Sequence, residues 1–176
     1  MKAGLFQTQH MLKRFIIALT ITAATLGSHA QDSLNKIIFR VTGEVKQELR
    51  LTAGEIAKLP HVNAILKDRN GKDVPYSGVA VQTMLNMAGV TLGRDLRGEN
   101  LSKFLLVRSA DGYEVLFSLA EIDTTFTTRI MILADQVEGH ALPADKGPLR
   151  MIVPGEKVPA RSSFQVVEFV VRFAKD

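Results

Sequence analysis

The last part of the chain shows the clearest alternation of hydrophobic and polar positions. Between Gln165 and Phe173, apolar side chains recur at every second residue: Val167, Phe169, Val171 and Phe173. Successive side chains of a strand point to opposite sides of a sheet, so this spacing places all four on one face. The pattern predicts a strand over residues 165–173 whose Val167-to-Phe173 face is buried.

Shorter apolar stretches bounded by turn residues occur along most of the preceding sequence. They predict strands over residues 37–42, 48–51, 62–66, 104–108, 113–117, 130–133 and 149–153. Asn70-Gly71 is a turn signal, and the residues after it, around Pro75, are predicted to be extended. Ser109-Ala110-Asp111-Gly112 has the length and the glycine of a hairpin connection.

Short helices are predicted between these strands. Thr52 with Glu55, and Ser118 with Glu121, have the spacing of a capping box, which marks the first turn of a helix. Apolar residues recur at helical spacing over residues 81–88. Many short strands interrupted by short helices predict an α+β domain with mixed β-sheets, although the order of the strands in the sheets is not readable from the pattern.

The first thirty residues have a different composition from the rest. Lys13-Arg14 precede an apolar run over residues 15–26, and Ser28-His29-Ala30 ends it with small residues at both positions that determine cleavage. This arrangement predicts a secretory signal peptide over residues 1–30. The run of about twelve residues is shorter than the roughly twenty that cross a bilayer, so a membrane anchor is the weaker alternative. Met11 is an alternative start that leaves the mature protein unchanged.

Removal of residues 1–30 from the 176-residue chain leaves 146, the size of one domain over residues 31–176. The leader contains three of the 22 basic residues and no acidic one, so the mature chain has 19 basic against 18 acidic residues. The basic residues are scattered along it, and we therefore expect no nucleic-acid partner. Export predicts a periplasmic or secreted location.

Cysteine is absent from the sequence, which excludes disulfides and thiolate chemistry. The mature chain has two histidines, His61 and His140, which stand alone, so a metal site built on histidines is not expected. His61 is interpreted as a strand-edge residue. No spacing of acidic residues identifies a general acid and base, and no catalytic residue is predicted.

Two short segments contain polar groups that suit a ligand. Ser162-Ser163 beside Arg161 have the hydroxyls and the guanidinium of an anion site, with a capped turn as the alternative. Asp111 lies at the predicted hairpin tip, where turn formation is its simplest role. Neither segment by itself decides between binding and local structure.

The ordered set of segments resembles the oxidoreductase molybdopterin-binding domain, the fold of sulfite oxidase and its bacterial relatives. The resemblance covers nearly the whole mature chain and rests on these stretches: Val41-Thr42-Gly43-Glu44-Val45, Leu51-Thr52, Leu59-Pro60, Tyr76-Ser77-Gly78-Val79, Ser109-Ala110-Asp111-Gly112-Tyr113, Gly147-Pro148-Leu149-Arg150-Met151-Ile152-Val153-Pro154-Gly155 and Ala160-Arg161-Ser162. The Gly147–Gly155 stretch is the most specific of them. The resemblance implies the sulfite-oxidase-type fold.

The resemblance also implies a molybdopterin cofactor whose molybdenum is held by one cysteine in the segment after the first helix. Lys67 or Asp68 occupies roughly that place here. A lysine and a tryptophan follow the Arg-Ser pair in the family, where this chain has Phe164 and Gln165. These two differences from the family, the missing cysteine and the Phe164-Gln165 pair, argue against oxygen transfer at molybdenum, and molybdenum is therefore not expected.

Cysteine-less members of this fold resemble periplasmic pterin-binding proteins that act as ligand sensors for a membrane-bound signalling partner. On that resemblance, a pterin or molybdopterin-like ligand is expected to contact these residues: Asp68, Arg108, Asp111, Tyr113, Arg150, Arg161, Ser162 and Ser163. Two alternatives remain open. One is a molybdopterin-dependent oxidoreductase with a metal ligand such as Asp68, and the other is an interaction module that binds no ligand.

Overall fold

A computed structural model describes residues 36–68 and 70–174. The predicted signal peptide, its cleavage site after Ala30 and the alternative start at Met11 lie outside these residues. Across the stretch that is described, no helix has both the length and the apolar character needed to span a membrane.

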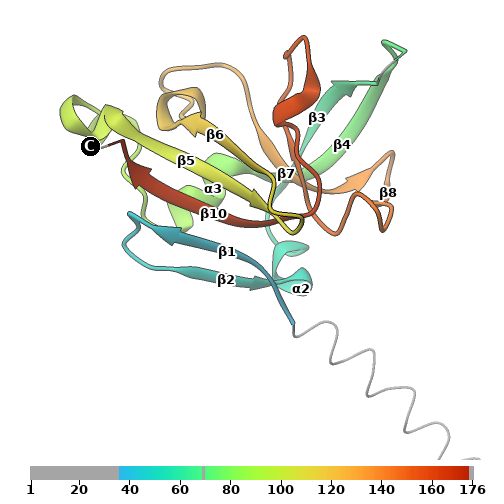
Figure 1. The fold of residues 1–176 in the computed structure, drawn as a ribbon, viewed down its shortest axis with the longest axis horizontal. Helices are drawn as coiled ribbons and strands as arrows, with labels where there is room; N and C mark the ends of the chain where they lie inside the picture. Colours follow the sequence, from blue (N-terminus) through green and yellow to red (C-terminus); the bar gives the residue numbers. More distant parts are fainter. Residues whose placement is uncertain (1–35, 69, 175–176) are drawn as a thin grey trace, which may run out of the picture. The chain divides into compact units, whose positions relative to one another are not determined.

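The described residues form two sheets (Figure 1). The first sheet has the order β2-β1-β10-β5-β6, with strands β2 (Leu49–Thr52), β1 (Ile37–Gly43), β10 (Val166–Phe173), β5 (Lys103–Ser109) and β6 (Glu114–Ser118). The second sheet has the order β3-β4-β7-β8, and β9 also pairs with β7: β3 (His61–Lys67), β4 (Asp73–Ala80), β7 (Ile132–Val137), β8 (His140–Ala141) and β9 (Arg150–Ile152). We call them the first and the second sheet.

The helices are short and connect the strands. They are α2 (Ala53–Ile56), α3 (Val81–Met87) and the 3-10 turns η1 (Gly93–Asp95), η2 (Gly98–Ser102), η3 (Leu119–Glu121) and η4 (Pro159–Arg161). In the first sheet β1 and β10 run parallel, whereas the other pairs in both sheets are antiparallel. The predicted α+β fold with mixed sheets and short helices is thus confirmed.

Both predicted capping boxes are present. The Thr52 hydroxyl accepts a hydrogen bond from the Glu55 backbone N–H at 3.2 Å, and the Glu55 carboxylate accepts one from the Thr52 N–H at 2.8 Å. Ser118 and Glu121 form the equivalent pair at the start of η3. These reciprocal bonds satisfy N–H groups that the first turn of a helix leaves unpaired, which explains why such short helices form here.

The main core lies between the first sheet, α3 and one face of the second sheet. Phe39 of β1 and Phe169 of β10 meet edge to face, with ring centroids 4.8 Å apart, and both are fully buried. Met84 and Leu85 of α3 are also fully buried in this core. The apolar spacing in residues 81–88 therefore serves packing.

The burial of β10 differs in part from the predicted alternation. Phe169 and Val171 are fully buried as predicted, but Val167 and Phe173 are only partly buried, and Val166 is fully buried instead. The pairing of β10 with β5 shifts register between Val166 and Glu168. An irregularity of this kind changes which residues face the core, so strict alternation fails at the start of the strand.

Strand β7 begins later and ends later than predicted. It spans Ile132–Val137 because its polar second half pairs with β4 and β8, for example Gln136 with Ser77 and Ala141. Ile132, Leu133 and Ala134 are all fully buried, so the second sheet is covered on both faces at this point. The smaller apolar cluster on its other face includes Tyr76 of β4.

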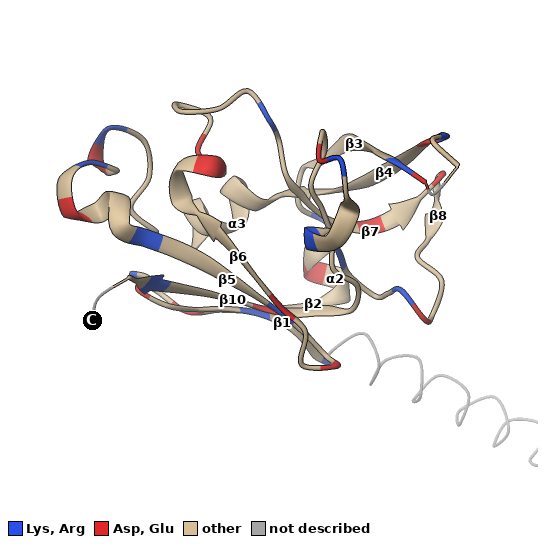
Figure 2. Cartoon of the chain, turned by 45° about the horizontal axis from the view of Figure 1, so that its top comes forward, with Lys and Arg blue, Asp and Glu red and all other residues tan. Residues whose placement is uncertain are grey.

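Charged residues of both signs are interspersed over the described elements (Figure 2). Several form ion pairs within a hairpin, such as Lys67 with Asp73 at 2.6 Å and Arg108 with Glu114 at 2.7 Å. These pairs join neighbouring strands, and their charges cancel locally.

His61 lies at the start of β3, as interpreted from the sequence, and is held by two acceptors. Its Nδ1 lies 2.7 Å from the Leu59 carbonyl oxygen, and its Nε2 lies 3.1 Å from the Asp135 carboxylate. Only a protonated imidazole donates through both nitrogens. Burial alone lowers the pKa of His61, but the bonds to Leu59 and Asp135 together outweigh it and raise the pKa above its usual value.

We expect His61→Gln to destabilise the protein more at pH 5.5 than at pH 8.5. A raised folded-state pKa stabilises the fold fully below the unfolded-state pKa of about 6.5, and this stabilisation disappears as the pH rises through the folded-state pKa. The difference should be on the order of 0.5 kcal/mol in the free energy of urea unfolding. Asp135→Asn is the matched control and should reduce the same pH dependence. Equal destabilisation at both pH values would contradict the interpretation.

Candidate functional site

A cleft of about 800 Å³ opens where the β3–β4 hairpin, the β5–β6 hairpin and the segment before β10 meet. Residues 159–164, which we call the wall segment, form one side of it and include η4. The lining residues are Leu66, Lys67, Asp68, Asn70, Val74, Tyr76, Ser109, Asp111, Tyr113, Lys146, Arg150, Pro159, Ala160, Ser162, Ser163 and Phe164.

Arg150 of β9 is the only arginine among these lining residues and is 7% exposed. Its guanidinium lies 4.2 Å from the ring centroid of Phe164 and 5.0 Å from that of Tyr76. It donates to the Tyr76 hydroxyl at 2.5 Å and, through Nε, to the Ser162 carbonyl oxygen at 3.4 Å. Burial lowers the pKa of Arg150, although Tyr76 opposes this effect.

Arg150 forms no ion pair with any carboxylate in the described part of the chain. Arginine stays protonated in proteins, so the site contains a positive charge that is largely removed from water. Such a charge is costly unless it is paired. An anionic group in the cleft would supply that partner.

Two serine hydroxyls of the cleft lining are also unsatisfied among the described residues. Ser109, 6% exposed, and Ser163, 4% exposed, are buried, and neither side-chain oxygen has a hydrogen-bond partner within residues 36–68 and 70–174. Both residues line the cleft. Ser162 differs, because its hydroxyl accepts from the Val153 N–H at 3.0 Å. The Ser162 hydroxyl therefore ties the end of η4 to the residue after β9, whereas the Ser163 hydroxyl has no partner in the part of the chain that the structure describes.

The aspartates predicted for the site lie at hairpin turns on the rim. Asp68 accepts backbone hydrogen bonds from Asn70 at 2.8 Å and Lys72 at 2.9 Å, and Asp111 accepts one from Tyr113 at 2.9 Å. The Tyr113 hydroxyl donates across the cleft opening to the Ala160 carbonyl oxygen at 3.0 Å. Both carboxylates therefore shape turns and also line the cleft.

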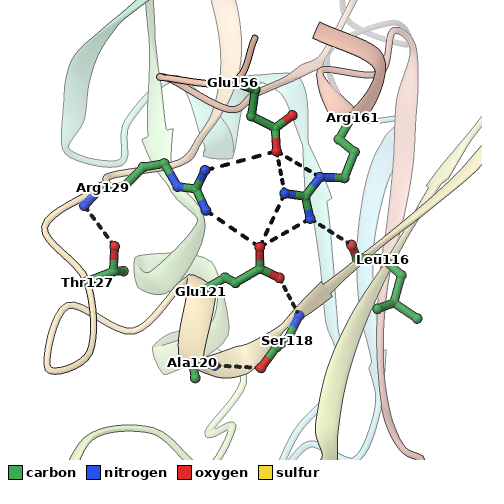
Figure 3. Close-up of polar contacts among 8 residues, drawn as sticks. All are labelled: Leu116, Ser118, Ala120, Glu121, Thr127, Arg129, Glu156 and Arg161. Carbon is green, nitrogen blue, oxygen red and sulfur yellow. Dashed lines mark hydrogen bonds and ion pairs between the residues drawn. The ribbon is translucent and has the colours of Figure 1, made fainter. Parts of the chain in front are cut away.

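Two of the predicted residues, Arg108 and Arg161, do not line the cleft. Arg108 donates to Glu114 at 2.7 Å and to Glu168 at 3.2 Å on the first sheet, and these bonds raise its pKa. Arg161 belongs to the wall segment but contacts Glu121 and Glu156 (Figure 3), neither of which lines the cleft. Each arginine pairs with one glutamate that is near in sequence and with one from a distant segment, Glu168 for Arg108 and Glu121 for Arg161. A single sequence does not reveal the distant partners.

The family model of the oxidoreductase molybdopterin binding domain matches residues 67–163, which include almost all of the cleft lining. This chain belongs to the oxidoreductase molybdopterin binding domain family. Its fold is similar to that of the sulfane dehydrogenase SoxCD from Paracoccus pantotrophus, with a TM-score of 0.60 and 18% sequence identity. The match covers 78% of this chain but only 39% of that one. A search of curated proteins found no match.

The family implies a molybdopterin-type cofactor, and the cleft fits the organic part of such a group. A guanidinium without a carboxylate suits an anion, the rings of Tyr76 and Phe164 suit a flat heterocycle, and the hydroxyls of Ser109 and Ser163 suit its polar edges. The residues do not fit protein ligation of molybdenum. The sequence has no cysteine, and no three His, Asp or Glu side chains gather in a metal-binding group among the residues described.

Sequence reasoning missed Tyr76, Ser109, Lys146 and Phe164 as lining residues of the family's cleft. Period-2 alternation offered a signal for Ser109, because Leu105 and Val107 are buried on the same face of β5. No local pattern marks Lys146, which lies in the connection before β9 and reaches the cleft only through the tertiary fold.

We expect Arg150→Met to change the free energy of unfolding of the ligand-free protein by less than about 1 kcal/mol, since removal of an unpaired buried charge offsets the loss of its hydrogen bonds. Phe39→Ala in the main core should instead cost about 3–5 kcal/mol. Urea unfolding of both variants tests this expectation. A loss above about 3 kcal/mol for Arg150→Met would show that Arg150 is retained for stability.

Proposed function

We propose that this chain is an exported, non-catalytic protein that binds a pterin or a molybdopterin-like anion in the cleft and acts as a ligand sensor or carrier. The observation that carries the proposal is Arg150, a buried guanidinium that lies near two aromatic rings and pairs with no carboxylate of residues 36–68 and 70–174. A planar anion would pair with the charge and lie against apolar ring surface. The family match supports the pterin as its chemical class.

The absence of cysteine supports binding rather than catalysis at molybdenum. Lys67 and Asp68 are the two residues at roughly the position expected for the cysteine. The Asp68 carboxylate accepts two backbone hydrogen bonds in a turn, and Lys67 pairs with Asp73. Among the described residues, Asp68 belongs to no group of three or more potential metal ligands of the kind that a metal centre requires.

Export and signalling are further parts of the proposal. The leader supports release into the periplasm or beyond, and Lys13-Arg14 is not the twin-arginine signal used for proteins exported already folded. A protein exported unfolded would acquire its ligand outside the cytoplasm. A membrane-bound signalling protein is the partner that the sensor role implies.

The first experiment is mass spectrometry of small molecules that co-purify with the exported protein, together with elemental analysis for molybdenum. A pterin without molybdenum supports the proposed function. Molybdenum at one atom per chain would instead indicate an oxidoreductase with an unusual ligand. A protein that is empty and also ignores added pterins would indicate an interaction module.

Titration with dihydroneopterin monophosphate gives a direct measure of binding. The sequence has two tyrosines and no tryptophan, and both tyrosines, Tyr76 and Tyr113, line the cleft, so intrinsic fluorescence reports on this site alone. Energy transfer from tyrosine to the bound pterin should quench the emission. Arg150→Met should weaken binding by about tenfold or more, because a charge-assisted bond is lost.

The matched control is Arg172→Met, which removes an exposed arginine outside the cleft and should leave the affinity unchanged. If the wild type and Arg150→Met bind the pterin with equal affinity, Arg150 does not contribute to binding, and the proposed function loses its main support.

A further inference from the structure

Two arginines and two glutamates form an ionic cluster that includes Arg161 of the wall segment (Figure 3). The Glu121 carboxylate lies 3.2 Å from Arg161 and 3.5 Å from Arg129. The Glu156 carboxylate accepts from Arg161 Nε at 2.8 Å and lies 4.0 Å from Arg129. The charges balance, and Glu156, at 13% side-chain exposure, is the most buried of the four.

The cluster joins two stretches that are distant in sequence. Glu121 ends η3 and Arg129 belongs to the connection from η3 to β7, whereas Glu156 precedes the wall segment and Arg161 lies within it. Arg161 also donates to the Leu116 carbonyl oxygen of β6 at 3.2 Å, and its guanidinium lies 4.5 Å from the centroid of the Phe117 ring. One side chain thus ties the wall segment to the edge of the first sheet.

The residues on either side of Arg161 face the cleft. Ala160 and Ser162 both line it, whereas Arg161 does not. The wall segment is also held by Tyr113, which donates to the Ala160 carbonyl oxygen at 3.0 Å, and by Arg150, which donates to that of Ser162 at 3.4 Å. The N–H groups of Met151 and Val153 donate to Ser163 O at 2.9 Å and to Ser162 Oγ at 3.0 Å. Arg161 adds ion pairs with two carboxylates, in which both partners are charged, and such bonds are roughly twice as strong as neutral hydrogen bonds.

We propose that Glu121, Glu156 and Arg129 are positioning residues for the cleft: through Arg161 they hold the wall segment at the place where Ser163 and Phe164 meet the ligand. The role in binding rests on the proposed function, whereas the role in holding the wall segment does not. The affinity of the cleft is thereby set by a cluster that the ligand does not touch.

Amide hydrogen exchange of the ligand-free protein tests whether the cluster holds the wall segment in place. The amides of Met151, Val153 and Ser162 donate to Ser163 O, Ser162 Oγ and Pro159 O, so their protection reports on the wall segment. In Arg161→Met, which keeps an apolar side chain over Phe117, we expect these amides to exchange about tenfold faster or more. The amides of β1 and β10 should keep their protection, which shows that the fold is intact.

Arg108→Met is the matched control. Arg108 also pairs with two glutamates, but it does so on the first sheet, away from the wall segment. Its replacement should leave exchange at residues 151–163 unchanged. Exchange in Arg161→Met equal to that of the wild type would overturn the proposal, as would equal acceleration by Arg108→Met.

Titration of the same variants with dihydroneopterin monophosphate tests the link to binding. We expect Arg161→Met and Glu156→Gln to weaken binding by about tenfold. Arg161→Lys keeps the positive charge but not the several N–H donors of the guanidinium, so its affinity should lie between that of these two variants and that of the wild type. Unchanged affinity in Arg161→Met would overturn the positioning role. If the wild type binds no pterin, the proposed function fails, and the exchange result still decides whether the cluster holds the wall segment.

Discussion

The arrangement of the site depends on the insertion of β10 between β1 and β5. The parallel pairing of β10 with β1 and its antiparallel pairing with β5 put the last strand in the centre of the first sheet, where Phe169 packs edge to face on Phe39. Strand β9 belongs to the second sheet. The chain between β9 and β10 must therefore cross from one sheet to the other. This crossing is the wall segment and its lead-in, and it closes one side of the cleft.

The site and the core follow different physical rules. In the main core, buried apolar side chains from both sheets and α3 pack against one another. In the cleft, a guanidinium is buried between two rings without a carboxylate, and two serine hydroxyls are buried without partners in the described residues. Buried polar groups without partners reduce the stability of a fold, and they are typical of sites where a ligand supplies the missing hydrogen bonds or charge. The contrast with Arg108 and Arg161, which have two carboxylates each, indicates which arginine is available to a ligand.

The chain belongs to the family although it lacks the cysteine expected to bind the metal, and the make-up of the cleft explains how both can hold. The hydrogen-bonding and aromatic surface of the cleft comes from both hairpins, β9 and the wall segment, and none of it requires a cysteine. A domain can therefore keep the surface that recognises the organic part of a cofactor while it lacks the thiolate that would anchor the metal. Binding and metal chemistry depend on different residues of the same fold.

Local physics, readable from the sequence, determined the element types, both capping boxes and the absence of thiolate chemistry. The eight residues expected at the site came from the family resemblance, and six of them line the cleft: Asp68, Asp111, Tyr113, Arg150, Ser162 and Ser163. These sequence-based results follow from periodicity, short-range capping and ordered motifs. Only the tertiary structure decided that Val166 replaces Val167 in the core, because a register shift lies in a pairing with a distant strand. It also decided that Arg161 turns away from the cleft while Tyr76 and Lys146 reach it. Those outcomes depend on partners far away in the chain, such as Glu121 for Arg161 and β5 for Val166, which the spacing of neighbouring residues does not encode.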